Sequence, residues 1–174
     1  MPKDGVYDVL FLCTRNAARS IIAEAVLNKL GQGKFKGYSA GTKPKGSIDP
    51  YALNLLRQMH YPVEELRSKS IEEFNAPGAQ AFDFIITLSD SAAGEITPQW
   101  PGKPVTAHWT FPDPSRFDTG DHGEAEIAAE FAETYKDIHA LLSTFVSLPH
   151  QSLDRLSLED KVDEMSAAHA ARKA

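Results

Sequence analysis

The sequence predicts a three-layer α/β fold in which a four-stranded parallel sheet lies between layers of helices. Two observations favour this fold class. Short apolar runs of strand type alternate along the chain with longer segments of helical periodicity. The chain has 174 residues, of which 42% are hydrophobic and 24% are charged, and this suits one globular domain. We expect the domain to cover residues 1–150 and a helical extension to cover residues 151–174.

The first part of the chain predicts two strands with a helix between them. Residues 7–12 form a short, mostly apolar run that is typical of a buried strand. Apolar residues at helical spacing predict a helix over 21–30, and glycines follow it. Alternation over residues 34–40 indicates a second strand, and residues 41–46, which contain glycine and proline, form a loop.

Two capping signals predict the next helical segments. Asp49 followed by Pro50 is an N-cap residue before a proline at the first helical position, so a helix begins there. Residues 70–74 favour one or two further turns, because Ser70 and Glu73 fit a capping box.

The second part of the chain predicts two more strands and two long helices. Residues 82–88 form the clearest strand, and residues 104–109 indicate a short fourth one. An amphipathic helix covers 124–146, and Pro149 ends it. A second helical pattern starts near Leu153 and runs into an Ala-rich end.

Composition excludes several classes of function. Lys and Arg number 18 and Asp and Glu number 24, so the net charge is −6, which makes the chain a poor candidate for coating DNA or an anionic membrane. A single cysteine, Cys13, excludes an intramolecular disulfide and a multi-thiolate zinc site. No apolar run approaches the ~18 residues of a membrane span, and no signal peptide pattern is present. We therefore expect a cytoplasmic location.

The segment that follows the first predicted strand carries the candidate chemistry. It reads Cys13, Thr14, Arg15, Asn16, Ala17, Ala18, Arg19 and Ser20, and it opens the first predicted helix. A tight loop at a helix N-terminus directs backbone N–H groups and the positive end of the helix dipole at one point, where a tetrahedral oxyanion binds. Arg19 adds a fork for two oxygens of that anion, and the sulfur of Cys13 would lie under its central atom. We expect Cys13 and Arg19 to be catalytic and the other residues to form an oxyanion-binding loop.

The same positive surroundings favour the thiolate of Cys13, which is the nucleophilic form. Ser20 can donate a hydrogen bond to the sulfur, and Asn16 tolerates the left-handed conformation that a tight loop needs. The alternative is that Cys13 is a small buried hydrophobic residue, as lone cysteines often are. A strand before the segment, a helix after it and a serine next to Arg19 favour the catalytic interpretation.

The spacing of Cys13, Arg19 and Ser20 resembles the low-molecular-weight protein tyrosine phosphatase superfamily. Further motifs follow in the order of its arsenate reductase branch, at residues 38–42, 49–50, 68–70, 82–87, 107–109 and 112–114. The resemblance covers about residues 6–150, and residues 148–156 resemble the C-terminal extension of some bacterial members. It implies the fold of that superfamily and a thiolate-dependent enzyme that acts on a tetrahedral oxyanion.

The resemblance also implies that Asp113 is catalytic, since in this superfamily a loop Asp before a Pro protonates the leaving oxygen. That carboxyl group must face the sulfur from the opposite side of the reacting atom, protonated in the first step and ionised in the second. Asp113 and Pro114 follow Trp109 in that position. The alternative is an ordinary Asp-Pro turn. Asp118 and Asp121 lie nearby and are expected to be solvated.

Arsenate reductases of this branch typically carry two more redox cysteines after the third strand. When this chain is aligned on Asp90 and Pro98, those positions hold Ser89 and Thr97. Arsenate reduction needs a second thiol that attacks the sulfur of the covalent arsenic adduct, and a hydroxyl group cannot do this. The resemblance therefore implies an external thiol such as glutathione, a glutaredoxin-like partner that regenerates Cys13, and no bound cofactor.

Three functions stay open at this point. The first is arsenate reduction with an external thiol, because the sequence beyond the loop follows that branch. The second is hydrolysis of phosphate monoesters, including phosphotyrosine, with Trp109 and Phe111 as candidate aromatic residues at the mouth of the site. The third is a non-catalytic module that binds an oxyanion or a partner.

The remaining polar residues give weaker signals. Lys43 and Lys45 near the loop are expected to be solvated. The six histidines show no spacing typical of a metal site, so no metal is expected. A homodimer stays open.

Overall fold

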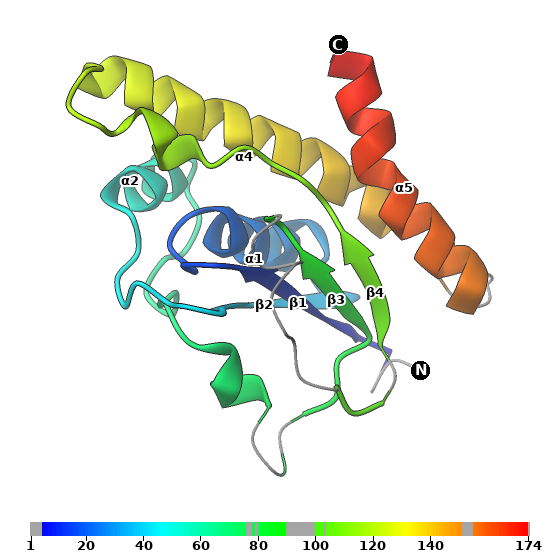
Figure 1. Cartoon of the computed structure of the whole chain (residues 1–174). Coiled ribbons are helices and arrows are strands. Elements are labelled where there is room, and N and C mark those ends of the chain that lie inside the picture. The colour runs from blue at the N-terminus through cyan, green and yellow to red at the C-terminus, as the bar shows by residue number, and fades with distance from the viewer. Residues whose placement is uncertain are drawn as a thin grey trace.

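The computed structural model describes residues 5–75, 78, 80–89, 100–102, 104–150 and 155–173. Within these residues the chain forms a four-stranded parallel sheet with helices packed against it (Figure 1). The strand order is β2-β1-β3-β4, so β1 lies inside the sheet and β4 lies at one edge. The predicted fold class, an α/β fold with a four-stranded parallel sheet and flanking helices, is confirmed.

The strands end at the same edge of the sheet. They are β1 (Tyr7–Cys13), β2 (Phe35–Gly41), β3 (Phe84–Thr87) and β4 (Val105–His108). Cys13 lies opposite Gly41, Leu12 lies opposite Thr87, and Thr87 lies opposite His108. The carboxyl ends of the strands therefore meet at one edge, which is where open parallel sheets bind ligands.

The described helices begin and end close to the predicted positions. They are α1 (Arg19–Leu30), α2 (Pro50–Gln58), η1 (Ile71–Phe74), η2 (Pro114–Phe117), α4 (Glu124–Ser147) and α5 (Arg155–Lys173), where η marks a 3₁₀ helix. Helix α1 begins before residue 21, because the Ala18 carbonyl already accepts a helical bond from the N–H of Ile22 at 2.8 Å. Asp49 caps α2 by accepting from the N–H of Tyr51 at 2.9 Å.

The sheet divides its side chains between two apolar clusters. Val9 and Phe11 of β1 belong to the larger cluster, to which α1, α2, α4 and α5 also contribute. Leu10 and Leu12 belong to a smaller cluster, against which Phe74 of η1 packs. Successive residues of a strand point to opposite faces. Because both faces of β1 are covered, its sequence is apolar without interruption from Val9 to Cys13.

The paired part of β3 is shorter than the predicted strand 82–88. Phe82 and Leu88 are only 3% and 0% exposed, so the apolar run is buried beyond both ends of the paired residues. An apolar sequence pattern indicates which residues are buried, not which are paired in the sheet. Here the buried residues extend beyond the paired residues at both ends.

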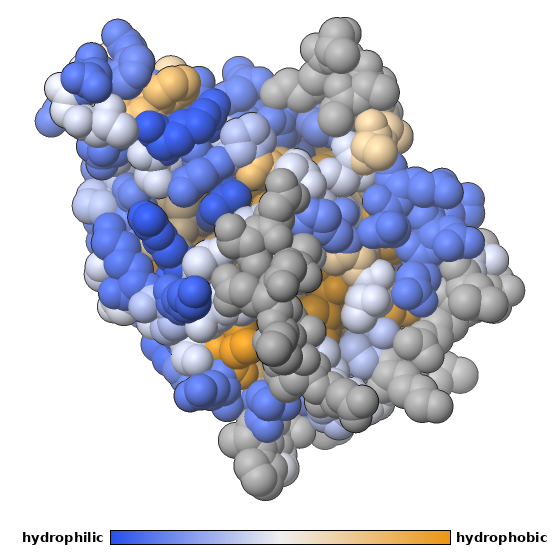
Figure 2. Space-filling model, viewed as in Figure 1, coloured by the Kyte–Doolittle hydropathy of each residue, from blue (hydrophilic) through white to orange (hydrophobic). Residues whose placement is uncertain are grey.

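Helix α5 packs against the edge strand β4 and against α4 (Figure 1). Leu158, Val162 and Met165 belong to the larger cluster, and the indole N–H of Trp109 donates to the Val162 carbonyl at 2.7 Å. The surface over α4 and the described outer side of α5 is largely hydrophilic (Figure 2). The helical pattern near the C-terminus is thus a helix that docks on the rest of the fold, and its separation from the domain at residue 151 stays a prediction.

None of the helices in the described ranges has the length and apolar character needed to cross a membrane.

Candidate active site

Residues 14–18 form a tight loop between β1 and α1. Asn16 has a φ of 49°, which is the left-handed conformation expected for the loop. Carbonyl oxygens between Cys13 and Ala17 accept hydrogen bonds from backbone N–H groups of residues 42–49, at 2.8–3.2 Å. Because the N–H and C=O of a trans peptide point in opposite directions, the amides of these peptide groups face the inner side of the loop. A row of inward N–H groups makes an anion-binding concavity.

The sulfur of Cys13 lies inside this loop, and the residue is 2% exposed. The backbone N–H of Asn16 donates to the sulfur at 3.3 Å, and Ser20 Oγ lies 2.9 Å from it. The side-chain amide of Asn16 donates to the same Ser20 oxygen at 2.8 Å. When Cys13 is a thiolate it has no proton to donate, so the Ser20 hydroxyl is then the donor of this contact. Hydrogen-bond donors and a helix N-terminus stabilise a thiolate.

A buried lysine supports the loop from behind. The backbone N–H of Lys69 donates to Asn16 Oδ1 at 2.8 Å. Its Nζ donates to the carbonyls of Ser39 and Arg67 at 2.9 and 2.8 Å, and lies 3.8 Å from Glu24 Oε1. Burial lowers the pKa of Lys69 and raises the pKa of Glu24. Lys69 belongs to the 68–70 motif of the resemblance, but neither Lys69 nor Glu24 was predicted to have a role at the site. A lysine in a polar segment and a glutamate in a helix carry no local sign of burial.

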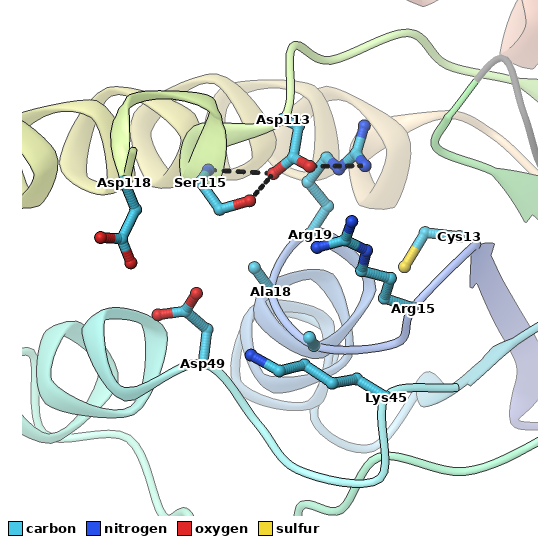
Figure 3. A pocket seen from close by; sticks show the side chains of 10 residues that line it. Cys13, Arg15, Ala18, Arg19, Lys45, Asp49, Asp113, Ser115 and Asp118 are labelled. Atoms are coloured by element: carbon cyan, nitrogen blue, oxygen red, sulfur yellow. Dashed lines mark hydrogen bonds and ion pairs between the residues drawn. The ribbon is translucent and has the colours of Figure 1, made fainter. Parts of the chain in front are cut away.

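A polar cavity of about 220 Å³ opens above the loop (Figure 3). Its lining consists of Cys13, Arg15, Ala17, Ala18, Arg19, Lys45, Asp49, Asp113, Ser115 and Asp118. The predicted loop residues therefore divide into two groups. Arg15, Ala17 and Ala18 line the cavity beside Cys13 and Arg19, whereas Asn16 and Ser20 are fully buried behind it. Thr14 belongs to neither group, since it is half-buried and does not line the cavity.

Arg19 and Asp113 lie next to each other on one side of the cavity (Figure 3). Arg19 Nη1 donates to the carbonyl of Phe111 at 2.9 Å, and Nη2 lies 3.8 Å from Asp113 Oδ2. The guanidinium group thus contacts the segment that carries Asp113. Arg15 brings a second guanidinium group close to the Cys13 side of the cavity (Figure 3).

Asp113 is the N-cap residue of η2. Its carboxylate accepts hydrogen bonds from the N–H and the hydroxyl of Ser115, at 2.9 and 2.7 Å. Burial acts to raise the pKa of Asp113, but these hydrogen bonds and the charges of Arg19 and Arg15 outweigh it, so the pKa lies below its usual range. These surroundings therefore favour the ionised carboxylate.

The opposite end of the cavity carries Asp49 and Asp118, which face each other (Figure 3). Burial is the main cause that raises the pKa of Asp49, and the charges of Asp118 and Asp113 add to it. Lys45 and Asp118 are exposed, as expected from the sequence, yet both line the cavity. Only the tertiary structure brings them to the site.

The expectation that Trp109 and Phe111 lie at the mouth of the site is wrong. They are 1% and 4% exposed and belong to the larger apolar cluster. Trp109 packs against Phe145 with ring centroids 5.9 Å apart and is tied to α5 by its indole N–H. The physical reason is that burying two large aromatic side chains in the core is more favourable than leaving them exposed at the site. Among the residues that the structure describes, no aromatic side chain lines the cavity.

Ser89, one of the two positions aligned with the redox cysteines, lies beside the loop. It is 5% exposed, and its Oγ lies 3.5 Å from Thr14 Oγ1. The other position, Thr97, lies outside the described residues, as do Asp90 and Pro98.

The family model of the low molecular weight phosphotyrosine protein phosphatases matches residues 8–158 of this chain. The chain belongs to this family. The matched residues include the whole loop from Cys13 to Ser20 and Asp113, whereas most of α5 lies beyond them. The site described above is therefore inside the region that this phosphatase family shares.

Several similar proteins are arsenate reductases. The arsenate reductase of Halalkalibacterium halodurans is 29% identical over 137 residues, which are 79% of this chain and 93% of the relative. The glutaredoxin arsenate reductase of Synechocystis is 29% identical over 61% of this chain and 77% of its own length. In fold, the chain is similar to the arsenate reductase of Archaeoglobus fulgidus, with a TM-score of 0.62 and 24% identity over 80% of this chain and 99% of that one.

Proposed function

We propose that this chain is an arsenate reductase-like enzyme that uses the Cys13 thiolate as nucleophile and an external thiol, such as glutathione, as reductant. The observation that carries the proposal is a thiol at the floor of a small polar cavity, with the guanidinium groups of Arg15 and Arg19 close to it. No described aromatic side chain lines this cavity, and Asp49 and Asp118 lie at its far end. A small polar cavity suits an inorganic oxyanion better than an aryl ester. The similarity to named arsenate reductases supports the same choice.

In the proposed first step the Cys13 thiolate attacks arsenic. A sulfur–arsenic bond forms, and one arsenate oxygen leaves as water, with Asp113 as the proton donor. The loop amides and Arg19 stabilise the charge on the remaining oxygens. Arg15 and Lys45 add positive charge along the path of the incoming anion.

In the second step the thiolate of glutathione attacks the Cys13 sulfur. A disulfide bond forms, the sulfur–arsenic bond breaks, and its electron pair leaves with arsenic as arsenite. The two thiols are oxidised while arsenic(V) is reduced to arsenic(III). A glutaredoxin thiolate then attacks the glutathione sulfur and releases Cys13. We place these steps in the cytoplasm, where reducing conditions maintain the thiols.

An external reductant is proposed because the chain carries no second thiol. Cys13 is its one cysteine, and Ser89 beside the loop carries a hydroxyl group that cannot take part in thiol exchange. Similarity to a glutaredoxin arsenate reductase supports glutaredoxin as the regenerating partner.

Hydrolysis of phosphate monoesters is the second candidate function. Family membership and the position of Asp113 at the same cavity as Cys13 favour it. The Cys13 thiolate would attack phosphorus, Asp113 would protonate the leaving oxygen, and water would then hydrolyse the phosphocysteine with Asp113 as base.

A paired assay on one preparation tests the proposal. We expect arsenate-dependent oxidation of glutathione in the presence of glutaredoxin, glutathione reductase and NADPH, and we expect Cys13→Ser to abolish it. After arsenate turnover without glutaredoxin, mass spectrometry of the intact protein should detect glutathione on Cys13. A wild-type rate no higher than that of Cys13→Ser would refute reduction, and turnover of an aryl phosphate alone would identify a phosphatase.

A further inference from the structure

Side chains of α5 contact every second residue along the end of β4 and just beyond it. The hydroxyl of Thr106 donates to Glu159 at 3.5 Å, the N–H of His108 donates to Asp163 at 3.0 Å, and the N–H of Thr110 donates to Ser166 at 3.0 Å. These contacts lie on the outer side of the edge strand, where a further strand would otherwise bind.

The spacing of the two partners explains why the contacts repeat. The strand residues are two apart, which is a rise of about 6.6 Å. The helix residues are four and then three apart, which is a rise of about 6 and 4.5 Å and keeps them on one face of α5. The helix therefore runs alongside the strand nearly in step with it. In this way α5 occupies the edge of the sheet.

The contacted segment leads directly into the site. Trp109 is held on the inner side by its N–H, which donates to the Thr87 carbonyl at 2.8 Å. His108 and Thr110, on either side of it, are held on the outer side by α5. The next residue is Phe111, whose carbonyl accepts from Arg19, and Asp113 follows two residues later.

We propose that Asp163 and Ser166 are positioning residues of the active site. By accepting the N–H groups of His108 and Thr110, they fix the segment that holds the Phe111 carbonyl against Arg19 and directs Asp113 into the cavity. This inference rests on the proposed function only in treating Asp113 as the proton donor. Both residues lie in the part of α5 beyond the residues that the family model matches. Their contacts with the segment after β4 are therefore an addition to the region that the family shares.

Amide hydrogen exchange measured by NMR tests the positioning without any substrate. In Asp163→Ala/Ser166→Ala the amides of His108, Thr110 and Ser115 should exchange at least about five-fold faster, the factor expected for one lost hydrogen bond. The Ser115 amide reports on the Asp113 carboxylate that it contacts. Alanine favours helix, so α5 itself should persist.

Two single variants serve as matched comparisons. Asp163→Asn keeps an oxygen acceptor, so the amide of His108 should exchange as in the wild type. Glu164→Ala removes an exposed carboxylate from a different side of the same helical turn and should change none of the three amides. Unchanged exchange of Thr110 and Ser115 in the double variant would overturn the inference.

A comparison of leaving groups provides the catalytic readout. Phenolate leaves less readily than 4-nitrophenolate, so hydrolysis of phenyl phosphate depends more on a proton from Asp113. In the double variant kcat/KM, which reports the steps up to release of the phenol, should fall about five-fold more for phenyl phosphate than for 4-nitrophenyl phosphate. A loss of folded protein would lower both rates equally. The single variant Asp163→Asn keeps an oxygen acceptor for the His108 N–H, so its ratio of the two rates should equal that of the wild type.

The two proposals fail in different ways. A wild-type protein that turns over neither arsenate nor the aryl phosphates refutes the proposed function, while the exchange rates still decide whether α5 fixes the segment. An active wild type whose leaving-group ratio is the same in the double variant refutes the positioning role alone.

Discussion

The Cys13 sulfur is the end of a chain of hydrogen bonds in which each side chain orients the next. The backbone N–H of Lys69 donates to the oxygen of the Asn16 amide, and the nitrogen of that amide donates to Ser20. The Ser20 hydroxyl lies 2.9 Å from the sulfur and donates to it when Cys13 is a thiolate. Asn16 uses both ends of its amide, so its orientation is fixed. The donors around Cys13 are therefore in place before an anion arrives, which is how preorganised sites stabilise charge.

Ser20→Ala should reduce activity without unfolding the protein. It removes the hydroxyl 2.9 Å from the sulfur and leaves the Asn16 amide without that acceptor. A hydrogen bond to a charged group corresponds to about 10- to 100-fold in rate. Turnover should fall by that factor, and iodoacetamide should alkylate Cys13 more slowly at pH 6. Ser147→Ala, at the exposed end of α4, is the control. Wild-type turnover in Ser20→Ala would contradict the assigned contact.

Asp113→Asn should remove proton transfer while keeping the size of the side chain. We expect kcat for phenyl phosphate to fall about 10²- to 10⁴-fold, the usual contribution of a general acid. The pKa of Asp113 lies below its usual range, so its protonated fraction shrinks as the pH rises through the acid range. The wild-type rate of the first step should therefore decline with rising pH. Stopped-flow measurement of phenol release from pH 4 to 8 should show this decline in the wild type and not in the variant.

At the scale of elements, the loop after β1 depends on the end of β2. A Cβ placed on Gly41 would lie 2.6 Å from the Thr14 carbonyl oxygen and 3.0 Å from the Asn16 nitrogen. Both neighbours are backbone atoms of the loop, so they have no flexible side chain that moves aside. Glycine is thus required at residue 41 for the close approach of two backbones.

Gly41→Ala should consequently disturb both stability and activity. Overpacking at a site that cannot relax costs about 1–3 kcal/mol of unfolding free energy. Chemical denaturation should show this loss, and turnover should fall because Thr14 and Asn16 shift. Gly123→Ala is the matched control, since a Cβ added there would have nothing within 4 Å and the φ of this residue is −74°. Equal stability of Gly41→Ala and Gly123→Ala would refute the argument.

At the scale of the whole molecule, His150 joins the chain after α4 to the first strand. It is 7% exposed and is surrounded by the rings of Tyr7, Phe35, Phe84 and Phe145. Its Nε2–H donates to the Phe145 carbonyl at 2.7 Å, and among the described residues Nδ1 has no hydrogen-bond partner. Burial lowers the pKa of His150, so the fold favours the neutral ring.

Stability should therefore decrease in acid. The folded pKa of His150 lies below its unfolded value of about 6.5, so the unfolded chain binds the proton more readily. The stabilisation is present above about pH 6.5 and is lost as the pH falls towards the folded pKa. Tm measured at pH 8 and pH 5.5 should drop less in His150→Phe than in the wild type, since carboxylates affect both equally. An equal drop in both proteins would exclude His150 as the cause.

Sequence patterns were sufficient for the order of elements. Residues 7–12 and 82–88 are mostly apolar because both faces of the sheet are covered, and Asp49-Pro50 starts a helix through contacts within two residues. Such signals are local in the chain. The same holds for Asn16, whose left-handed conformation belongs to the loop itself. The contact between Ser20 and Cys13 was also predicted, because a tight turn joins them.

Predictions for residues distant in the chain were less complete. Trp109 and Phe111 were candidates for the mouth of the site, but both are buried in the larger apolar cluster. Trp109 also bonds to Val162 of α5, and no pattern within residues 109–111 predicts a helix some fifty residues later. Lys69 and Glu24 pair behind the loop although each looks like a solvated charge in its own segment. Burial of a charge depends on what packs around it, which neighbouring residues do not determine.

The sequence by itself determined the strand–loop–helix unit of Cys13, Arg19 and Ser20, because periodicity, capping and loop chemistry act over a few residues. Only the tertiary structure decided which groups surround that unit. It brings Asp113, Lys45 and Asp49 to one cavity, places the aromatic residues after β4 in the core, and sets Asp163 and Ser166 against the strand that leads to Asp113. These contacts join residues far apart in the chain, and they exist because burying the apolar faces of α4 and α5 fixes where those segments lie.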